Sequence, residues 1–212
     1  MRTAGCVHLD GDRRAELTVW RPTDGRWYAL NSSTNYAYGS YLSVQWGDSA
    51  AGDVPVPGDY DGDGRMDLAV WRPSTGVWYI LKSSDNYSYA TYLAVQWGDQ
   101  ALGDVPLPGD YDGDGKTDPA VWRASTGTWY WLRSSDAYTY GTYGVVQWGS
   151  QADGDVPMPA DYDGDGKADP AVWRASTGTW YWLRSSDAYS YGTYWAVQWG
   201  SPAEGDVPVR EK

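Results

Sequence analysis

The stretch that decides the fold runs from Asp110 to Trp131 and reads Asp-Tyr-Asp-Gly-Asp-Gly-Lys-Thr-Asp-Pro-Ala-Val-Trp-Arg-Ala-Ser-Thr-Gly-Thr-Trp-Tyr-Trp. An acidic, glycine-containing loop is followed by a run of β-forming residues, a short turn and a second run rich in aromatic residues. The same order of residues occurs four times at a spacing of 51, as shown by Trp20, Trp71, Trp122 and Trp173. Repeats of this length are typical of propeller blades and solenoid units, which cannot bury their apolar faces alone.

The third repeat predicts three or four short antiparallel strands. The segments 119–123 and 128–133 form a hairpin across the turn 124–127, whose glycine is expected to take a positive φ. A third strand is expected over 138–148. The segment 155–159 is expected at a sheet edge, because its alternate prolines cannot donate to a ladder. No segment has a helical period, so each repeat is expected to be one antiparallel blade.

The expected fold class is therefore all-β: a β-propeller of four 51-residue antiparallel blades in a single domain over 1–212. The repeats run over about 8–58, 59–109, 110–160 and 161–212. Met1–Cys6 stands where the later repeats have Gly-Asp-Val-Pro, whereas an extra copy, Gly205–Val209, ends the chain. We expect this C-terminal DVPV strand to pair into the first blade and close the ring, protecting its edges. Either a monomer closes four blades or a homodimer shares an eight-bladed ring.

The composition excludes several classes of protein. The 212 residues include 15 Trp and 19 Tyr but no Phe, which is too aromatic for a disordered chain. A net charge of −12 leaves no basic surface for nucleic acid, and no apolar run is long enough for a membrane span. Cys6 is the single cysteine and His8 the single histidine, so neither a disulfide framework nor histidine-based catalysis is expected.

Each of the last three repeats begins with the pattern D-x-D-x-D-G-x-x-D. Carboxylates at positions 1, 3, 5 and 9, with glycine at 6, match the start of a calcium-binding EF-hand loop. In such a loop the carboxylates face one centre, and the residue at loop position 7 presents its backbone carbonyl. Hard oxygen donors favour Ca²⁺ over Zn²⁺, which would prefer histidine or cysteine. The predicted metal ligands are Asp59, Asp61, Asp63, Arg65, Asp67, Asp110, Asp112, Asp114, Lys116, Asp118, Asp161, Asp163, Asp165, Lys167 and Asp169.

The alternative is an acidic turn that only carries surface charge, but four carboxylates within nine residues would repel one another without a cation. The glutamate of an EF-hand at position 12 is absent, so water is expected to complete the coordination. In the first repeat His8 replaces the first aspartate and Arg13 replaces the glycine. We expect that loop, with Asp10, Asp12 and Glu16, to be a degraded site, empty or partly filled.

These loops, preceded by Val-Pro-x-Pro and followed by Ala-Val-Trp-Arg, resemble FG-GAP/VCBS repeats over nearly the whole chain. Such repeats are the calcium-loop blades of integrin-α-type propellers and of many bacterial secreted proteins. The resemblance implies Ca²⁺ in the loop that enters each blade and a role in adhesion or carbohydrate recognition. It also implies an extracellular setting, although no signal segment opens this chain. Propellers of this family typically have seven blades, so the blade count stays open.

The tryptophans divide into two groups. Twelve of the 15 recur in every repeat and are expected to pack between blades. The other three, Trp131, Trp182 and Trp195, occupy positions that vary between repeats. With Asp136 and Asp187 in nearby loops, they are a candidate sugar platform, because an indole face stacks on a pyranose while carboxylates accept its hydroxyl protons. Packing between unlike blades is the alternative.

No catalytic constellation stands out, and we expect that the protein is not an enzyme. Fifteen of the 28 carboxylates lie in the four acidic loops, and no nucleophile elbow, histidine pair or phosphate loop is present. Two functions remain. One is a calcium-binding, lectin-like module with repeated weak glycan sites, whose avidity would come from multivalency. The other is a calcium-rigidified scaffold for a protein partner, selected or engineered for its repeat symmetry.

Overall fold

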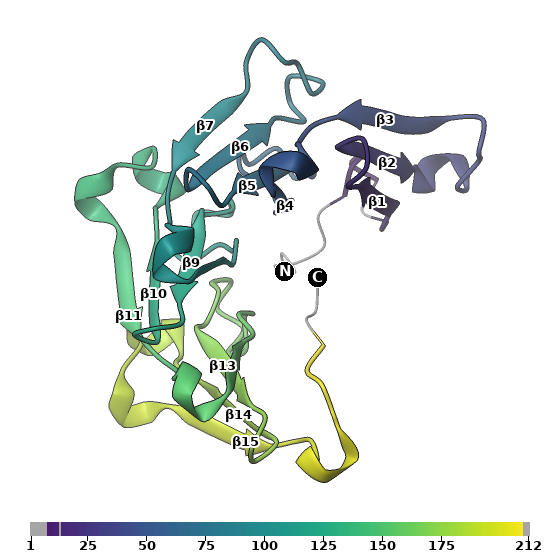
Figure 1. Cartoon of the computed structure of the whole chain (residues 1–212). Coiled ribbons are helices and arrows are strands. Elements are labelled where there is room, and N and C mark those ends of the chain that lie inside the picture. The colour runs from purple at the N-terminus through teal and green to yellow at the C-terminus, as the bar shows by residue number, and fades with distance from the viewer. Residues whose placement is uncertain (1–7, 13, 210–212) are drawn as a thin grey trace. The chain divides into compact units, whose positions relative to one another are not determined.

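A computed structural model describes residues 8–12 and 14–209 of the chain. Within this part the protein is all-β apart from single-turn 3-10 helices, and it forms four antiparallel sheets (Figure 1). Each of the last three sheets combines three strands of one repeat with an edge strand from the end of the preceding repeat. The four sheets are the blades of a β-propeller fold, as the 51-residue period predicted. The expectations that concern Met1–Cys6 and Arg13 lie outside the described residues.

The contacts of the chain divide it into two compact units, and the unit that ends at Gln100 holds the first two sheets. The first sheet has the order β1-β2-β3, built from β1 (Leu17–Arg21), β2 (Arg26–Leu30) and β3 (Tyr41–Gln45). The second has the order β4-β5-β6-β7, built from β4 (Val54–Pro55), β5 (Leu68–Arg72), β6 (Val77–Leu81) and β7 (Leu93–Gln96). The single-turn helices here are η1 (Ser32–Thr34) and η2 (Ser49–Ala51).

The unit that begins at Ala101 holds the third and fourth sheets. The third has the order β11-β10-β9-β8, built from β8 (Asp104–Pro106), β9 (Ala120–Arg123), β10 (Thr128–Trp131) and β11 (Gly144–Gln147). The fourth has the order β12-β13-β14-β15, built from β12 (Asp155–Pro157), β13 (Ala171–Arg174), β14 (Thr179–Trp182) and β15 (Trp195–Gln198). The remaining single-turn helices are η3 (Gln100–Leu102), η4 (Ser134–Asp136), η5 (Tyr140–Thr142), η6 (Gln151–Asp153), η7 (Ser185–Asp187), η8 (Tyr191–Thr193) and η9 (Pro202–Glu204).

The third repeat shows which predicted strands form. Strands β9, β10 and β12 lie within their predicted ranges, and β12 lies at a sheet edge as its prolines require. The third strand is shorter than predicted: β11 begins at Gly144 because Tyr138 has a φ of 61° and residues 140–142 form a 3-10 turn. Gly127 has a φ of 64°, and a Cβ there would lie 1.9 Å from the carbonyl oxygen of Gly149, so only glycine fits this turn.

The C-terminal segment does not form the strand that the sequence predicted. Among the described residues the first sheet has three strands, and 206–209 belongs to no strand. Val207 and Val209 are 77% and 80% exposed. The other Asp-Val-Pro segments pair with the first long strand of the repeat that follows them.

Three tryptophans form the centre of each blade. In the second sheet Trp71 and Trp78 lie opposite each other on β5 and β6, and both indole N–H groups donate to the carbonyl oxygen of Trp97 at 3.1 and 2.9 Å. The same arrangement recurs in the first and third sheets. It satisfies the polar end of each ring while the rest of the ring is buried. Trp199, which is 78% exposed, departs from the predicted burial of the recurring tryptophans.

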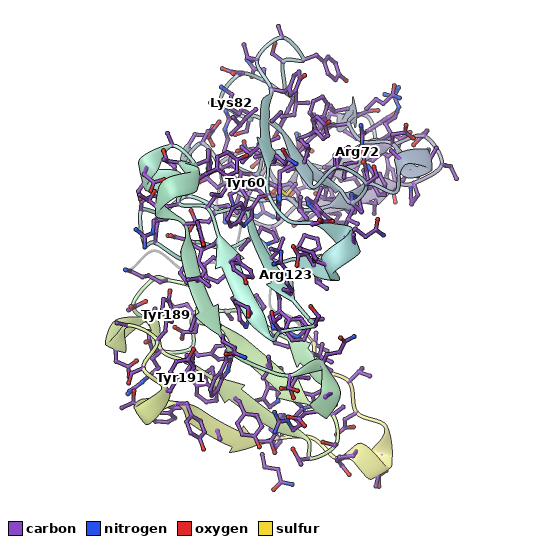
Figure 2. All side chains as sticks on the ribbon, turned by 60° about the vertical axis from the view of Figure 1, so that its left-hand side comes forward. Tyr60, Arg72, Lys82, Arg123, Tyr189 and Tyr191 are labelled. Atoms are coloured by element: carbon purple, nitrogen blue, oxygen red, sulfur yellow. The ribbon has the colours of Figure 1, made fainter. Side chains whose placement is uncertain are left out.

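An arginine after the first of these tryptophans ties each long strand to its edge strand. Arg72 donates from Nε and Nη2 to the two carboxylate oxygens of Asp53, at 2.7 and 2.9 Å, and the Asp53 side chain is fully buried. The guanidinium also lies over the ring of Tyr79, 4.9 Å from its centroid. Arg123 and Arg174 repeat both contacts in the third and fourth sheets; Arg72 and Arg123 are labelled in Figure 2. Such bidentate pairs are among the strongest charge-assisted hydrogen bonds.

Replacing Asp53 by alanine should lower the free energy of unfolding by about 3 kcal/mol, because the Arg72 guanidinium loses its buried partner. Asp24→Ala is the matched control: it removes an exposed ion pair with Arg21, 3.6 Å long, and should cost under about 1 kcal/mol. Urea denaturation of the two variants and the parent protein measures the difference. An equal loss of unfolding free energy in the two variants would show that the buried Arg72–Asp53 pair stabilises the protein no more than the exposed one.

Candidate metal centre

An acidic loop precedes the first long strand of each of the last three blades. In the second repeat Asp59, Asp61 and Asp67 converge, and each offers a carboxylate oxygen within 4.8 Å of the others. A cation that binds oxygen at roughly 2.3–2.6 Å can contact oxygens that far apart. The other two loops gather Asp110, Asp112 and Asp118, and Asp161, Asp163 and Asp169, in the same way.

The carboxylate at position 9 connects each loop to its blade. Asp67 is fully buried, and its Oδ2 accepts hydrogen bonds from the backbone N–H groups of Tyr60 and Asp61 at 2.8 and 3.2 Å. Its Oδ1 accepts from the backbone N–H of Ser83, beyond the end of β6, at 2.7 Å. Asp118 makes the same three bonds in the third repeat. One side chain thus holds the start of the loop against the segment that follows the hairpin.

The carboxylates at positions 1 and 3 shape the loop itself. Asp59 accepts from the backbone N–H groups of Gly62 and Gly64, at 2.7 and 2.9 Å, so the chain curls around this side chain. Asp61 accepts from the Ser84 hydroxyl at 2.6 Å. The corresponding bonds recur in the third and fourth repeats. The repeated geometry shows that the loop conformation follows from the motif and not from the neighbours of one repeat.

The carboxylate at position 5 is not a member of these clusters. Asp63 accepts from the backbone N–H of Arg65 at 2.8 Å and from the Ser83 hydroxyl at 2.9 Å, and the Arg65 side chain also donates to it. The structure therefore brings three of the four predicted carboxylates of each loop together and places the fourth against the loop backbone. The same backbone bond joins Lys116 to Asp114 and Lys167 to Asp165.

The first loop keeps a carboxylate cluster in a changed form. Asp10, Asp12 and Glu16 offer oxygens within 4.8 Å of one another. Glu16 takes the place of the position-9 aspartate, and its Oε2 accepts from the backbone N–H of Leu9 at 2.7 Å. The Nδ1 atom of His8 lies 2.8 Å from the carbonyl oxygen of Arg14. The cluster has therefore lost its first-position carboxylate, as the sequence predicted, although three other carboxylates still meet.

Burial raises the pKa of the position-9 carboxyls. The pKa values of Asp67 and Asp118 rise to about 7, and that of Asp169 to about 6, because desolvation outweighs the backbone N–H donors. A neighbouring aspartate at position 3 adds repulsion in the same direction. A bound cation favours the ionised form instead, so protons and metal compete for these carboxylates.

In the presence of a chelator, stability should fall as the pH rises from about 4 to about 7, because the folded state binds the Asp67 and Asp118 protons more tightly than the unfolded chain does. The Asp67→Asn variant should lose less stability over this pH range, because it lacks one of the titrating carboxyls. Thermal unfolding in chelator across this pH range measures it. The exposed Asp24→Asn variant should keep the parental profile, and an Asp67→Asn profile parallel to the parent's would contradict the assignment.

Sequence reasoning missed the serine pair that completes each acidic loop. Ser83 is fully buried and donates from its backbone to Asp67 and from its hydroxyl to Asp63, while Ser84 donates to Asp61. Without these donors the acidic loop would lack its connection to the hairpin. The available signal was the recurrence of Ser-Ser at 32–33, 83–84, 134–135 and 185–186.

The prediction of an exposed sugar platform is wrong for Trp131. Its side chain is 4% exposed and stacks on Tyr111, with ring centroids 5.2 Å apart, and it meets the edge of Tyr189 at 5.6 Å. Its cross-strand partner is Gly144, where a Cβ would lie 1.9 Å from the indole. In the third repeat the tryptophan therefore fills the space that the glycine on the paired strand leaves, and it is not exposed.

The other predicted platform residues are only partly available. Trp182 is half-buried and stacks on Tyr162 at 5.3 Å, whereas Trp195 is 51% exposed. Asp187 already accepts from Arg184 and Thr193, at 2.7 and 2.6 Å. In the third repeat Asp136 accepts from Thr139 and Thr142. The structure therefore leaves Trp195 as the most accessible of these predicted residues.

The comparisons with known proteins agree with the loops and the sheets. The family model of the FG-GAP-like repeat matches residues 8–70, 59–121 and 110–172, and the chain belongs to this family. The solved structure of a streptogramin B lyase has a similar fold, with a TM-score of 0.50 and 9% sequence identity. The similarity covers 92% of this chain and 53% of that chain, so this chain spans about half of the lyase's length. No curated protein matches the chain.

None of the helices in the described part of the chain is long and apolar enough to cross a bilayer.

Proposed function

We propose that this protein is a calcium-binding β-propeller module that recognises carbohydrates. The metal part of the proposal rests on one observation: three carboxylates with oxygens within 4.8 Å of one another, repeated in three successive loops. Each cluster contains one fully buried aspartate, Asp67, Asp118 or Asp169. The donors are carboxylate oxygens without histidine or cysteine, a set that favours a hard cation such as Ca²⁺.

The role proposed for calcium is structural. The cation supplies positive charge where several carboxylates meet, and it favours the ionised form of the buried aspartate. Because Asp67 contacts both the loop and Ser83, ordering the loop also orders the segment after β6. Three bound ions would change the net charge from −12 to about −6.

Calcium should raise the melting temperature, and a chelator should lower it, because the ion binds the folded loops and not the unfolded chain. Calorimetric titration of the chelator-treated protein should show at least three sites. Asp118→Asn should remove one of them, whereas Asp24→Asn should remove none. Magnesium should have a smaller effect, because it requires a stricter octahedral geometry. An unchanged melting temperature in chelator would show that the calcium assignment is wrong.

The carbohydrate part is supported by exposed tyrosines at the same place in every repeat. Each repeat has two of them, which lie just before the last strand of its sheet or, in the case of Tyr41, at the first residue of that strand. Figure 2 labels one of them, Tyr191 of the fourth repeat. A tyrosine offers a ring face to the C–H groups of a sugar and a hydroxyl to its polar groups. Their exposed fractions range from 44% to 86% over Tyr38, Tyr41, Tyr89, Tyr92, Tyr140, Tyr143, Tyr191 and Tyr194.

Labelled protein in calcium should bind neutral glycans on an array, with stronger signals at high glycan density, because several weak sites act together. Removing calcium should weaken the signal through loss of loop order. Thermal unfolding under the same conditions confirms that the protein on the array is folded. A silent array with folded, calcium-loaded protein would exclude carbohydrate recognition.

A protein-binding scaffold is the second candidate, favoured by the apolar residues exposed on the first and last sheets. Leu17 and Val19 on β1 are 60% and 59% exposed, whereas Leu68 and Val70 at the same positions of β5 are fully buried. On the fourth sheet Trp195 and Val197 are 51% and 46% exposed. Exposed apolar surface of this kind marks protein interaction sites. Self-association measured by light scattering, together with a silent glycan array, would favour this function.

A further inference from the structure

We propose that the first repeat carries a pocket for a neutral monosaccharide ring, an inference that rests on the proposed carbohydrate function. The pocket has a volume of about 290 Å³ and opens beside the first acidic loop. This lies at the lower end of the roughly 300–1,000 Å³ of small-molecule sites, which suits one sugar ring. Leu9 and Leu42 line its apolar part, Tyr41 and Tyr87 supply rings, and the polar groups come from Asp10, Asn31 and Ser40.

The corresponding position in the other unit is filled by aromatic rings. Leu9 corresponds to Tyr111, and Ala29 corresponds to Trp131, two repeats further along the chain. Tyr111 and Trp131 stack there with centroids 5.2 Å apart, and Trp131 also contacts Tyr189, the counterpart of Tyr87. Leu9 and Ala29 are 6% and 2% exposed, so small side chains occupy interior positions that rings fill elsewhere. Of these two small residues Leu9 lines the pocket, next to Leu42 and Tyr87.

Within its described part the first repeat also lacks an ion pair that the second and fourth repeats have in the segment after the hairpin. In the second repeat Lys82 pairs with Asp85 at 2.9 Å, and in the fourth Arg184 pairs with Asp187 at 2.7 Å. In the fourth repeat a threonine hydroxyl also donates to the aspartate, at 2.6 Å. The first repeat has uncharged residues at these three positions, namely Asn31, Thr34 and Ser40. Asn31 and Ser40 line the pocket and can both donate and accept hydrogen bonds, as neutral hydroxyl groups require.

The two tyrosines suit a sugar ring. Tyr87 has a φ of 57°, and its hydroxyl donates to the carbonyl oxygen of Met66 at 3.0 Å, so its ring is held before any ligand binds. Ordering a ring that is already fixed costs little conformational entropy. Tyr41 is 56% exposed and offers a face for stacking on sugar C–H groups.

The charge of the pocket selects against acidic sugars. Asp10 is negatively charged at neutral pH, and among the described residues no lysine or arginine lines the pocket. The cations that the later repeats carry at the Asn31 position, Lys82, Arg133 and Arg184, are absent from the first repeat. A carboxylate-bearing sugar would therefore meet a like charge without a compensating partner.

Two variants test the pocket in the full chain. Ala29→Trp combined with Leu42→Gly reproduces the Trp131 and Gly144 pair, which fills the space without overpacking the strand pair. Asn31→Arg is a surface substitution that restores the cation of the third and fourth repeats. Asp24→Asn is the control, because it changes an exposed side chain in the turn between β1 and β2, outside the pocket lining.

Saturation-transfer NMR and calorimetry with glucose, galactose and mannose, each at millimolar concentration in calcium, measure binding. The parent protein should bind at least one of these sugars and should not bind glucuronate. The Ala29→Trp/Leu42→Gly variant and Asn31→Arg should each lose at least tenfold in sugar affinity, while Asp24→Asn keeps the parental affinity. Unchanged melting temperatures and calcium stoichiometry show that the variants are folded, and Asn31→Arg decides the question if the filled variant does not fold.

Two results would overturn the pocket. Parental affinity in both folded pocket variants would show that the sugar binds elsewhere, and the proposed function would stand. Absence of binding to all three sugars by the parent would also exclude the pocket. The glycan array then separates the two proposals, because a positive array would retain carbohydrate recognition and a silent one would remove it.

Discussion

The arrangement of each blade depends on one buried carboxylate at the end of its acidic loop. Asp67 accepts backbone hydrogen bonds from the start of its own loop and from Ser83, 16 residues further along the chain. Water does not reach this side chain, so the protein itself must stabilise its charge, and desolvation raises its pKa to about 7. The same group therefore positions the loop and belongs to a carboxylate cluster that could hold a cation.

The blade is held together by contacts that repeat with the sequence. Two indole N–H groups share one carbonyl oxygen, and a bidentate arginine joins the long strand to the edge strand. Because the same residues recur every 51 positions, the last three sheets have the same strand order and the same arginine–aspartate pair. The pocket proposed above lies instead in a repeat that differs from the others. The first repeat differs most, because Leu9, Ala29 and Asn31 replace two larger side chains and a cation.

Most of the fold and the composition of the candidate metal site could be predicted from local sequence. Alternating β-forming residues, the glycine of the hairpin turn and the D-x-D-x-D-G-x-x-D motif act through the backbone of their own segment. Predictions failed where distant residues decide. An exception is the late start of the third strand, which has a local cause: Tyr138 takes a left-handed conformation, and its backbone N–H donates to the carbonyl oxygen of Arg133. Trp131 is buried because Gly144, on the neighbouring strand, leaves room for it.

The sequence by itself determined the all-β class, the repeat of 51 residues and the carboxylates that the loops carry, because spacing along the chain sets these properties. Tertiary structure alone decided which three carboxylates meet, since Asp63 turns to the loop backbone and Ser83 arrives from beyond the hairpin. It also decided that Leu9 and Leu42 line a pocket with Tyr87, whereas Tyr111 and Trp131 pack together beside Tyr189 in the later repeats. The physical reason is that side-chain volume and charge act on neighbours in space, which the order of residues does not specify.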